Sequence, residues 1–206
     1  EAEYIHDLRE LFGTTPWREK YENIKYCTHS LGPSLQILKE PLIQVSCFDT
    51  GSHVNKKPGQ HDAMVAIFRT SSNAIVKLLV SFINYCPAHG QRYRFYFDNG
   101  YFERTADYEG EHSGTSYFYS DSHHIKKELN DIKIGEGLLK NQHLDSIGNH
   151  GGANYELLKQ FYKRINTGKK SPLGLKEALL MSIPGIFAAE SARKDGKNID
   201  IQYPWN

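Results

Sequence analysis

The chain has 206 residues, of which 39% are hydrophobic and 24% charged, and its formal net charge is +1. These values are typical of a globular domain with a sizeable core, and they argue against extensive disorder. Acidic and basic residues are mixed without a basic stripe, so we expect no nucleic-acid partner. The longest apolar run, residues 74–83, is too short to cross a bilayer, and we expect no membrane partner.

The first half of the chain predicts one helix and several antiparallel strands. Tyr4 and His6 fit a short strand. A helix over 34–40 follows Gly32-Pro33, since proline is tolerated in a first helical turn. β-Branched and aromatic runs separated by short polar turns predict further strands over 42–48, 65–70, 74–82, 92–97 and 101–104. The last four of these form two hairpins, which indicates one broad sheet.

The second half predicts an irregular segment followed by two helices. Residues 105–149 are rich in Gly, Ser, Asp, His and Tyr, and we interpret them as a functional loop excursion. Apolar residues at helical spacing predict a helix from Tyr155 that ends at Thr167-Gly168. A second helix over 175–193 should be kinked or divided at Pro184-Gly185. The expected fold is α+β: a large open, mainly antiparallel sheet with helices on one face.

Three cysteines, Cys27, Cys47 and Cys86, are widely spaced and odd in number. This pattern fits neither a disulfide framework nor a zinc knuckle. Free, buried thiols are the expected state.

Two tyrosine–histidine pairs near the start carry the strongest chemical signal. Tyr4 and His6 point to the same side of a strand, so both can reach one pocket. Tyr26 and His29 flank the entry to a helix. Imidazole suits general base work near neutral pH, and a phenol can donate a proton. Ordinary packing of these rings in the core is the alternative interpretation.

Other motifs are weaker or missing. In the loop Asn149-His150-Gly151-Gly152, the glycines permit a tight turn that leaves helix N–H groups open to a ligand oxygen. No HExxH or His-x-His motif occurs, so we expect no metal site. Neither a GxSxG elbow nor a GxxxxGK loop is present, and no dinucleotide fingerprint is visible.

Taken together, the 4–8 run, the Tyr-x-Thr-His-x-Leu-Gly-Pro run at 26–33 and the His-Gly-Gly loop at 150–152 resemble the C-terminal domain of Gfo/Idh/MocA-type oxidoreductases. The closest branch is that of the NAD-dependent glycosidases of the α-N-acetylgalactosaminidase type. The resemblance continues through the hairpins to the closing helix at 188–193 and covers nearly the whole chain.

The resemblance implies that one domain binds the cofactor and a second domain binds the substrate. Family members bind NAD or NADP through an N-terminal Rossmann domain, which we expect to be absent from this chain. Residues 1–206 then form a single substrate-binding and catalytic domain with no cofactor-binding residues of its own, inactive without the upstream domain. The open sheet face is expected to form a homo-oligomer interface.

The resemblance also implies roles for site residues. Tyr26 and His29 are the proton-handling pair, whereas Tyr4 and His6 line a sugar-like substrate. His150 contacts hydroxyls or a leaving group, and Tyr108 is a further candidate for substrate contact.

Three functions stay open on the sequence. The first is the substrate domain of an NAD(P)-dependent oxidoreductase acting on a sugar or sugar derivative. The second is a glycosidase that uses transient oxidation at C3 and elimination of the aglycone. The third is a non-catalytic dimerisation or carbohydrate-binding module. We expect a cytoplasmic location.

Overall fold

The structure is a computed structural model that describes residues 1–9, 21–54, 56, 61–84, 91–98, 100–105, 115–120, 130–133 and 153–205. The strands are β1 (Ala2–Ile5), β2 (Leu42–Asp49), β3 (Ala63–Thr70), β4 (Ile75–Ser81), β5 (Arg92–Phe97), β6 (Gly100–Thr105), β7 (Thr115–Ser120), β8 (Asn130–Lys133) and β9 (Ile199–Asp200). The helices are the short η3 (Asn23–Lys25), α1 (Thr28–Leu38), α2 (Ala153–Thr167) and α3 (Leu175–Ala192).

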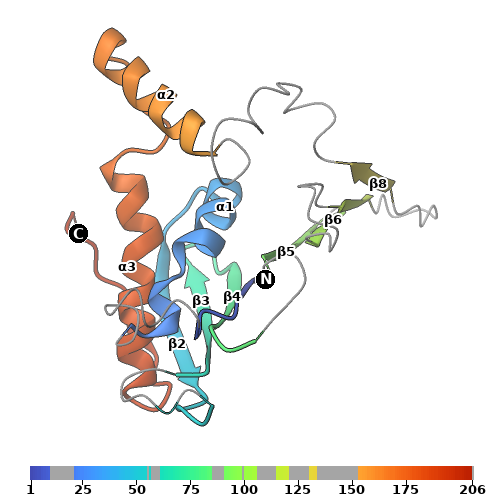
Figure 1. The fold of residues 1–206 in the computed structure, drawn as a ribbon, viewed down its shortest axis with the longest axis vertical. Helices are drawn as coiled ribbons and strands as arrows, with labels where there is room; N and C mark the ends of the chain where they lie inside the picture. The colour runs from blue at the N-terminus through green and yellow to red at the C-terminus, as the bar shows by residue number, and fades with distance from the viewer. Residues whose placement is uncertain are drawn as a thin grey trace.

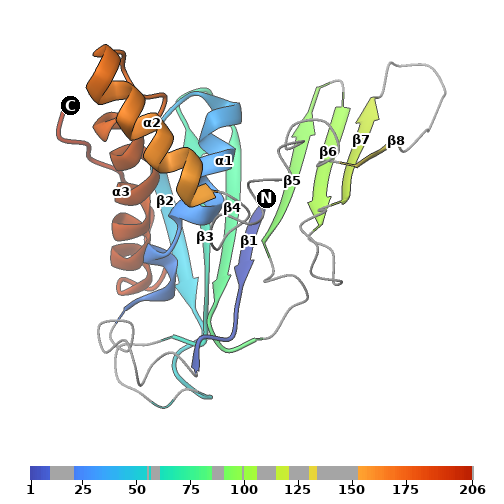
Figure 2. The same cartoon turned by 45° about the horizontal axis from the view of Figure 1, so that its top comes forward.

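These strands form one open sheet in the order β8-β7-β6-β5-β1-β4-β3-β2-β9. β1 and β4 pair in parallel, and every other neighbouring pair of described strands is antiparallel. The N-terminal strand therefore lies in the middle and joins the β2–β4 meander to the β5–β8 meander (Figure 2). The mainly antiparallel open sheet is confirmed.

Both predicted hairpins are confirmed. β3 and β4 meet at a turn in which Asn73 adopts a φ of 69°, and β5 pairs with β6 across residues 98–100. Within the predicted excursion 105–149, however, β7 and β8 extend the sheet. The interpretation of this segment as loop was wrong for residues 115–120 and 130–133. Short strands bounded by polar residues carry too little alternation to be recognised alone.

Helices α1 and α3 cover one face of the β1–β4 part of the sheet (Figure 1). The side chains pointing to this face form the core. Its fully buried members include Leu31 from α1, Val45 from β2, Phe68 from β3, Leu78 from β4 and Ala188 from α3. Burial of this apolar surface is the main stabilising contribution to the fold.

Helix α1 begins earlier than predicted. It starts at Thr28 rather than after Pro33, so Pro33 lies inside the helix instead of in its first turn. A proline there cannot donate a hydrogen bond to the carbonyl oxygen four residues before it, which belongs to His29.

Pro184-Gly185 was predicted to kink or divide the second helix. Helix α3 is continuous from Leu175 to Ala192, so it is not divided there. Gly185 instead allows α3 to approach η3 closely. A Cβ at this position would lie 2.6 Å from the Sγ of Cys27 and 2.9 Å from the carbonyl oxygen of Ile24. The glycine therefore sets the spacing between α3 and the segment that enters α1.

Cys27 and Cys47 are free and buried, as predicted. The thiol of Cys27 contacts the carbonyl oxygen of Met181 at 3.2 Å. Burial raises the pKa of both thiols to about 12, which keeps them protonated. Cys86 lies outside the described residues.

Helix α2 ends at Thr167, followed by Gly168 with a φ of +66°, as predicted. It projects away from the rest of the fold (Figure 1) and makes at most marginal contact with the other described helices and strands. One row of its side chains is apolar and exposed: Leu157 by 67%, Phe161 by 59% and Ile165 by 63%. No described helix is long and apolar enough to span a membrane.

The face of the sheet opposite α1 and α3 combines charged and apolar side chains. Glu1 lies 3.4 Å from the Nζ of Lys77 and 3.6 Å from the Nη1 of Arg94, and Arg94 also donates to Glu103 at 2.8 Å. This row of charges links β4, β1, β5 and β6. On β3 and β4, Ile67 and Ile75 are exposed by 51% and 61%.

Candidate active site

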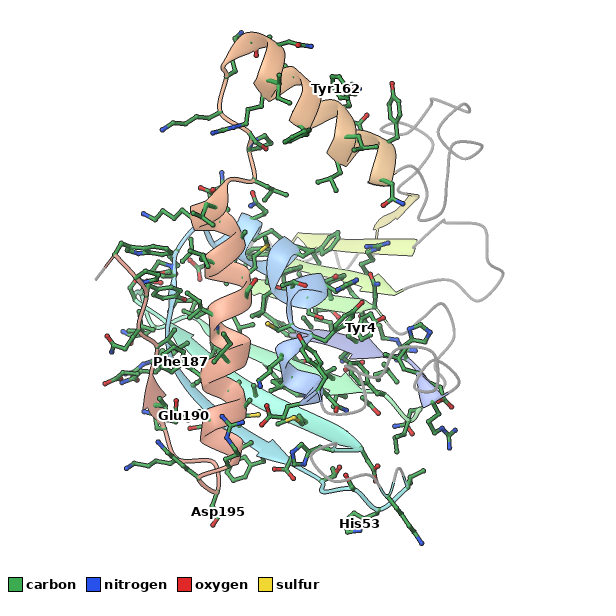
Figure 3. All side chains as sticks on the ribbon, turned by 60° about the vertical axis from the view of Figure 1, so that its left-hand side comes forward. Tyr4, His53, Tyr162, Phe187, Glu190 and Asp195 are labelled. Atoms are coloured by element: carbon green, nitrogen blue, oxygen red, sulfur yellow. The ribbon has the colours of Figure 1, made fainter. Side chains whose placement is uncertain are left out.

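The C-terminal end of β1 and the start of α1 bring Tyr4, His6, Tyr26 and His29 together. Tyr4 lies in β1, and His6 is the first residue after Ile5 ends the strand. Tyr26 precedes α1, and His29 lies in its first turn. Figure 3 shows Tyr4 over the sheet and beside α1. The two pairs predicted from the sequence therefore converge on one location.

The four rings form one contiguous cluster. The hydroxyl of Tyr4 and the Nδ1 of His6 are hydrogen-bonded at 3.0 Å. The rings of Tyr26 and His29 are stacked with their centroids 4.6 Å apart and their planes at 20°. Tyr4 joins the pairs, because its ring centroid lies 5.1 Å from that of Tyr26 and 5.2 Å from that of His29.

Burial decreases from the base of this cluster to its rim. Tyr4 and Phe82 are buried, and the Phe82 ring contacts Tyr26 edge-on at 5.7 Å between centroids. His6 and Tyr26 are half-buried, and His29 is exposed. An apolar base thus supports imidazole and phenol groups that a ligand can reach.

Tyr93 of β5 holds the backbone of His29 in place. Its hydroxyl donates a hydrogen bond of 2.5 Å to the carbonyl oxygen of His29, the oxygen to which the ring nitrogen of Pro33 cannot donate. Tyr93 is itself buried, and burial raises the pKa of its phenol although Arg104 opposes the shift. The hydroxyl therefore stays protonated and remains a donor at neutral pH.

Asp7 supplies a carboxylate beside the cluster. The guanidinium of Arg9 donates to it from Nε at 2.9 Å, and this hydrogen bond lowers the pKa of Asp7 below its ordinary value. The carboxylate is consequently ionised near neutral pH and directed toward Arg9. In this state it is an acceptor rather than a proton donor.

Sequence reasoning missed Phe82 and Tyr93. Pro33, four residues after His29, was a signal that the carbonyl of His29 needs another donor. Nothing local to α1 indicates that the donor comes from β5. Tyr108 and His150 lie outside the described residues, so they stay predictions. In the described part of the chain, no three His, Cys, Asp or Glu side chains converge as a metal site.

No protein-family model matches the sequence, and no curated protein matches it. Solved structures do. Levoglucosan dehydrogenase in complex with NADH has a TM-score of 0.74 and 13% identity, over 98% of this chain and 57% of its own. An inositol dehydrogenase homolog from Azotobacter vinelandii, complexed with NADH and myo-inositol, has a TM-score of 0.70 and 17% identity, over 97% and 55%.

A third similar structure is an oxidoreductase from Agrobacterium radiobacter in complex with NAD+, L-tartaric acid and magnesium, with a TM-score of 0.71 and 14% identity over 97% of this chain and 55% of its own. The fold is that of the Gfo/Idh/MocA-type oxidoreductases. The chain spans just over half the length of these neighbours. None of the three is a glycosidase by its description, so the glycosidase branch of the resemblance finds no support here.

Removing the Tyr93 hydroxyl should loosen the start of α1. We expect Tyr93→Phe to lower the free energy of unfolding by about 1–3 kcal/mol, because the carbonyl of His29 loses its donor. Tyr96→Phe is the matched control, since Tyr96 is exposed on the same strand and should change stability by less than about 0.5 kcal/mol. Urea denaturation followed by circular dichroism measures both, and equal stability of the two variants would contradict the assignment.

Proposed function

We propose that this chain is the substrate-binding domain of an NAD(P)-dependent oxidoreductase that acts on a sugar or sugar derivative. The observation that carries the proposal is the cluster of Tyr4, His6, Tyr26 and His29, which presents accessible imidazoles on a buried aromatic base. The fold supports it, because solved structures with this fold include dehydrogenases crystallised with NADH and with myo-inositol.

The reaction requires a base for the hydroxyl proton. As an alcohol becomes a ketone, the carbon gives up a hydride and the oxygen gives up a proton. His29 is the proposed acceptor of that proton at an imidazole nitrogen, because its ring is exposed and reachable by substrate. Tyr26, stacked on His29, orients the imidazole and completes the proton-handling pair.

Tyr4 and His6 are proposed to bind the sugar. Their hydrogen bond at 3.0 Å fixes the positions of both rings, and a phenol and an imidazole are groups that can hydrogen-bond a sugar hydroxyl. Aromatic rings also pack against the apolar faces of sugars. His150 and Tyr108 remain candidates for additional contacts to the substrate.

A nicotinamide cofactor, NAD or NADP, would accept the hydride. The described residues form an antiparallel sheet, whereas dinucleotides are bound at the end of a parallel βαβ unit. A separate nucleotide-binding domain is therefore proposed to hold the cofactor over His29. The exposed side chains of α2 support such a domain, because large hydrophobic groups gathered on one helix are rarely left in water. There are six of them: Tyr155, Leu157, Leu158, Phe161, Tyr162 and Ile165.

The alternatives differ in their products. A glycosidase cycle would release the aglycone and exchange a sugar carbon-bound proton with solvent, without net NADH. A non-catalytic carbohydrate module would do neither. The cytoplasmic location stays a prediction.

The test of the proposal is a sugar and aryl-glycoside panel. The chain joined to its nucleotide-binding domain should reduce NAD or NADP with at least one sugar or polyol. His29→Ala should lower kcat/KM by about 10²–10⁴-fold, the contribution of a general base. His53→Ala changes an exposed histidine outside the cluster and should retain full activity. Absorbance of the reduced nicotinamide measures turnover; full activity in His29→Ala would remove the proposed base.

The open sheet face is proposed as the surface through which copies of the protein associate. The exposed side chains of Ile67 and Ile75 lie beside a charged row that includes Lys77 and Glu1. Interfaces combine apolar contacts with a polar surround in this manner.

Placing a charge on this face should weaken association. We expect Ile67→Glu to shift the sedimentation velocity profile toward the monomer, because an unpaired carboxylate would be buried between copies. Ile186→Glu, at an exposed position of α3, is the control and should leave the profile unchanged. A wild-type protein that is monomeric at high concentration would refute the interface.

A further inference from the structure

A cavity lies at the opposite end of α1 from His29. It has a volume of about 340 Å³ and lies between the C-terminal end of α1, the first turns of α3 and the C-terminal segment. Its apolar lining comes from Leu35, Pro41, Leu180, Met181 and Trp205. This volume is within the range that small-molecule sites occupy. His29 and Gln36, a lining residue, are separated by roughly 10 Å of helix.

The aromatic wall of this cavity is held firmly. Trp205 is stacked on Tyr203 with the ring centroids 5.2 Å apart and the planes at 13°. Tyr203 is buried, and its hydroxyl donates to the carbonyl oxygen of Leu42 at 2.9 Å. The indole is thus anchored to the start of β2 although it is 41% exposed itself.

The two carboxylates of the lining have partners within the protein. Glu40 accepts hydrogen bonds from the hydroxyl of Ser71 at 2.8 Å and the backbone N–H of Ser72 at 3.0 Å. The hydroxyl of Ser72, which also donates to Glu40, and the hydroxyl of Ser71 are the main groups that lower the pKa of Glu40 to about 2. Glu177 accepts from the backbone N–H of Gly174 at 2.8 Å, at the start of α3.

The two ammonium groups of the lining are different. Neither Lys39 nor Lys176 forms an ion pair with a carboxylate among the described residues. The Nζ of Lys176 lies 5.3 Å from the centroid of the Trp205 ring. Lys39 follows the last turn of α1 in a left-handed conformation, with a φ of 55°. Hydrogen-bond donors with positive charge therefore border an apolar cavity.

We propose that this cavity binds a small organic anion with a flat apolar body, such as an aromatic carboxylate. The body packs between Leu35, Leu180 and the edge of Trp205, and the carboxylate accepts hydrogen bonds from Lys39 and Lys176. The carboxylate of the ligand supplies acceptors to these two exposed ammonium groups, and the protein's own carboxylates at the site are already hydrogen-bonded to other donors. The site is separate from the proposed sugar site and stands without it.

Benzoate is a suitable probe, and the indole N–H signal of Trp205 in a ¹⁵N–¹H correlation spectrum is the reporter. The chain has two tryptophans, so Trp17→Phe identifies that signal. We expect benzoate to shift it saturably, with a dissociation constant on the order of 1 mM. Benzyl alcohol, which has the same ring but no charge, should bind about tenfold more weakly, as expected from the loss of one charge-assisted hydrogen bond.

Charge-changing variants distinguish binding of benzoate at this cavity from nonspecific binding elsewhere on the protein. The double variant Lys39→Gln/Lys176→Gln should bind benzoate no better than benzyl alcohol, whereas Lys39→Arg/Lys176→Arg should retain the preference. Lys163→Gln/Lys169→Gln removes the same charge from exposed positions at α2 and is the matched control, expected to bind as wild type. The site is refuted by no saturable shift, by equal affinity for the two probes, or by unchanged benzoate affinity in the glutamine pair at the cavity.

Discussion

A hydrogen bond from the hydroxyl of Tyr93 to the carbonyl oxygen of His29 ties the first turn of α1, and with it His29, to the sheet. Pro33 makes this bond necessary, because a helix with proline inside it leaves one carbonyl without its usual donor. The donor comes from β5, which is the neighbour of β1 in the sheet. The first turn of α1 is thereby fixed relative to β1, the strand that carries Tyr4. Stacking of Tyr26 on His29 depends on this placement.

This arrangement explains how reactive side chains remain accessible although they lie against the hydrophobic core. Tyr4 and Phe82 belong to the hydrophobic core and cannot move far without opening it. His6, Tyr26 and His29 pack on these two rings. Their exposure increases from the half-buried His6 and Tyr26 to the exposed His29. Proton transfer from a bound hydroxyl requires a base that is rigidly supported and accessible to the substrate. The fixed aromatic base therefore links the stability of the fold to the proposed function.

Local patterns predicted much of this fold, and non-local contacts account for what was missed. Turn residues and β-branched runs identified the β3–β4 and β5–β6 hairpins, and the period of two placed Tyr4 and His6 together. β7 and β8 were not predicted because they are short and lie in an otherwise irregular segment, so only their pairing identifies them as strands. The role of Tyr93 was missed because its hydrogen-bond partner, His29, lies 64 positions earlier in the chain. Pro184-Gly185 was expected to kink or divide α3; the helix is continuous there, and Gly185 allows its close approach to Cys27.

The central claim is that His6 and His29 belong to one substrate site. Histidine labelled with ¹³C in the complete protein, the proposed oxidoreductase, gives a direct test by NMR, with each signal assigned from a His→Gln variant. On titration with a sugar that the enzyme oxidises, the signals of His6 and His29 should shift together and saturate at the same concentration. Those of His53 and His61 should not move. Turnover of that sugar with no change at His29, or shifts confined to other histidines, would contradict the account.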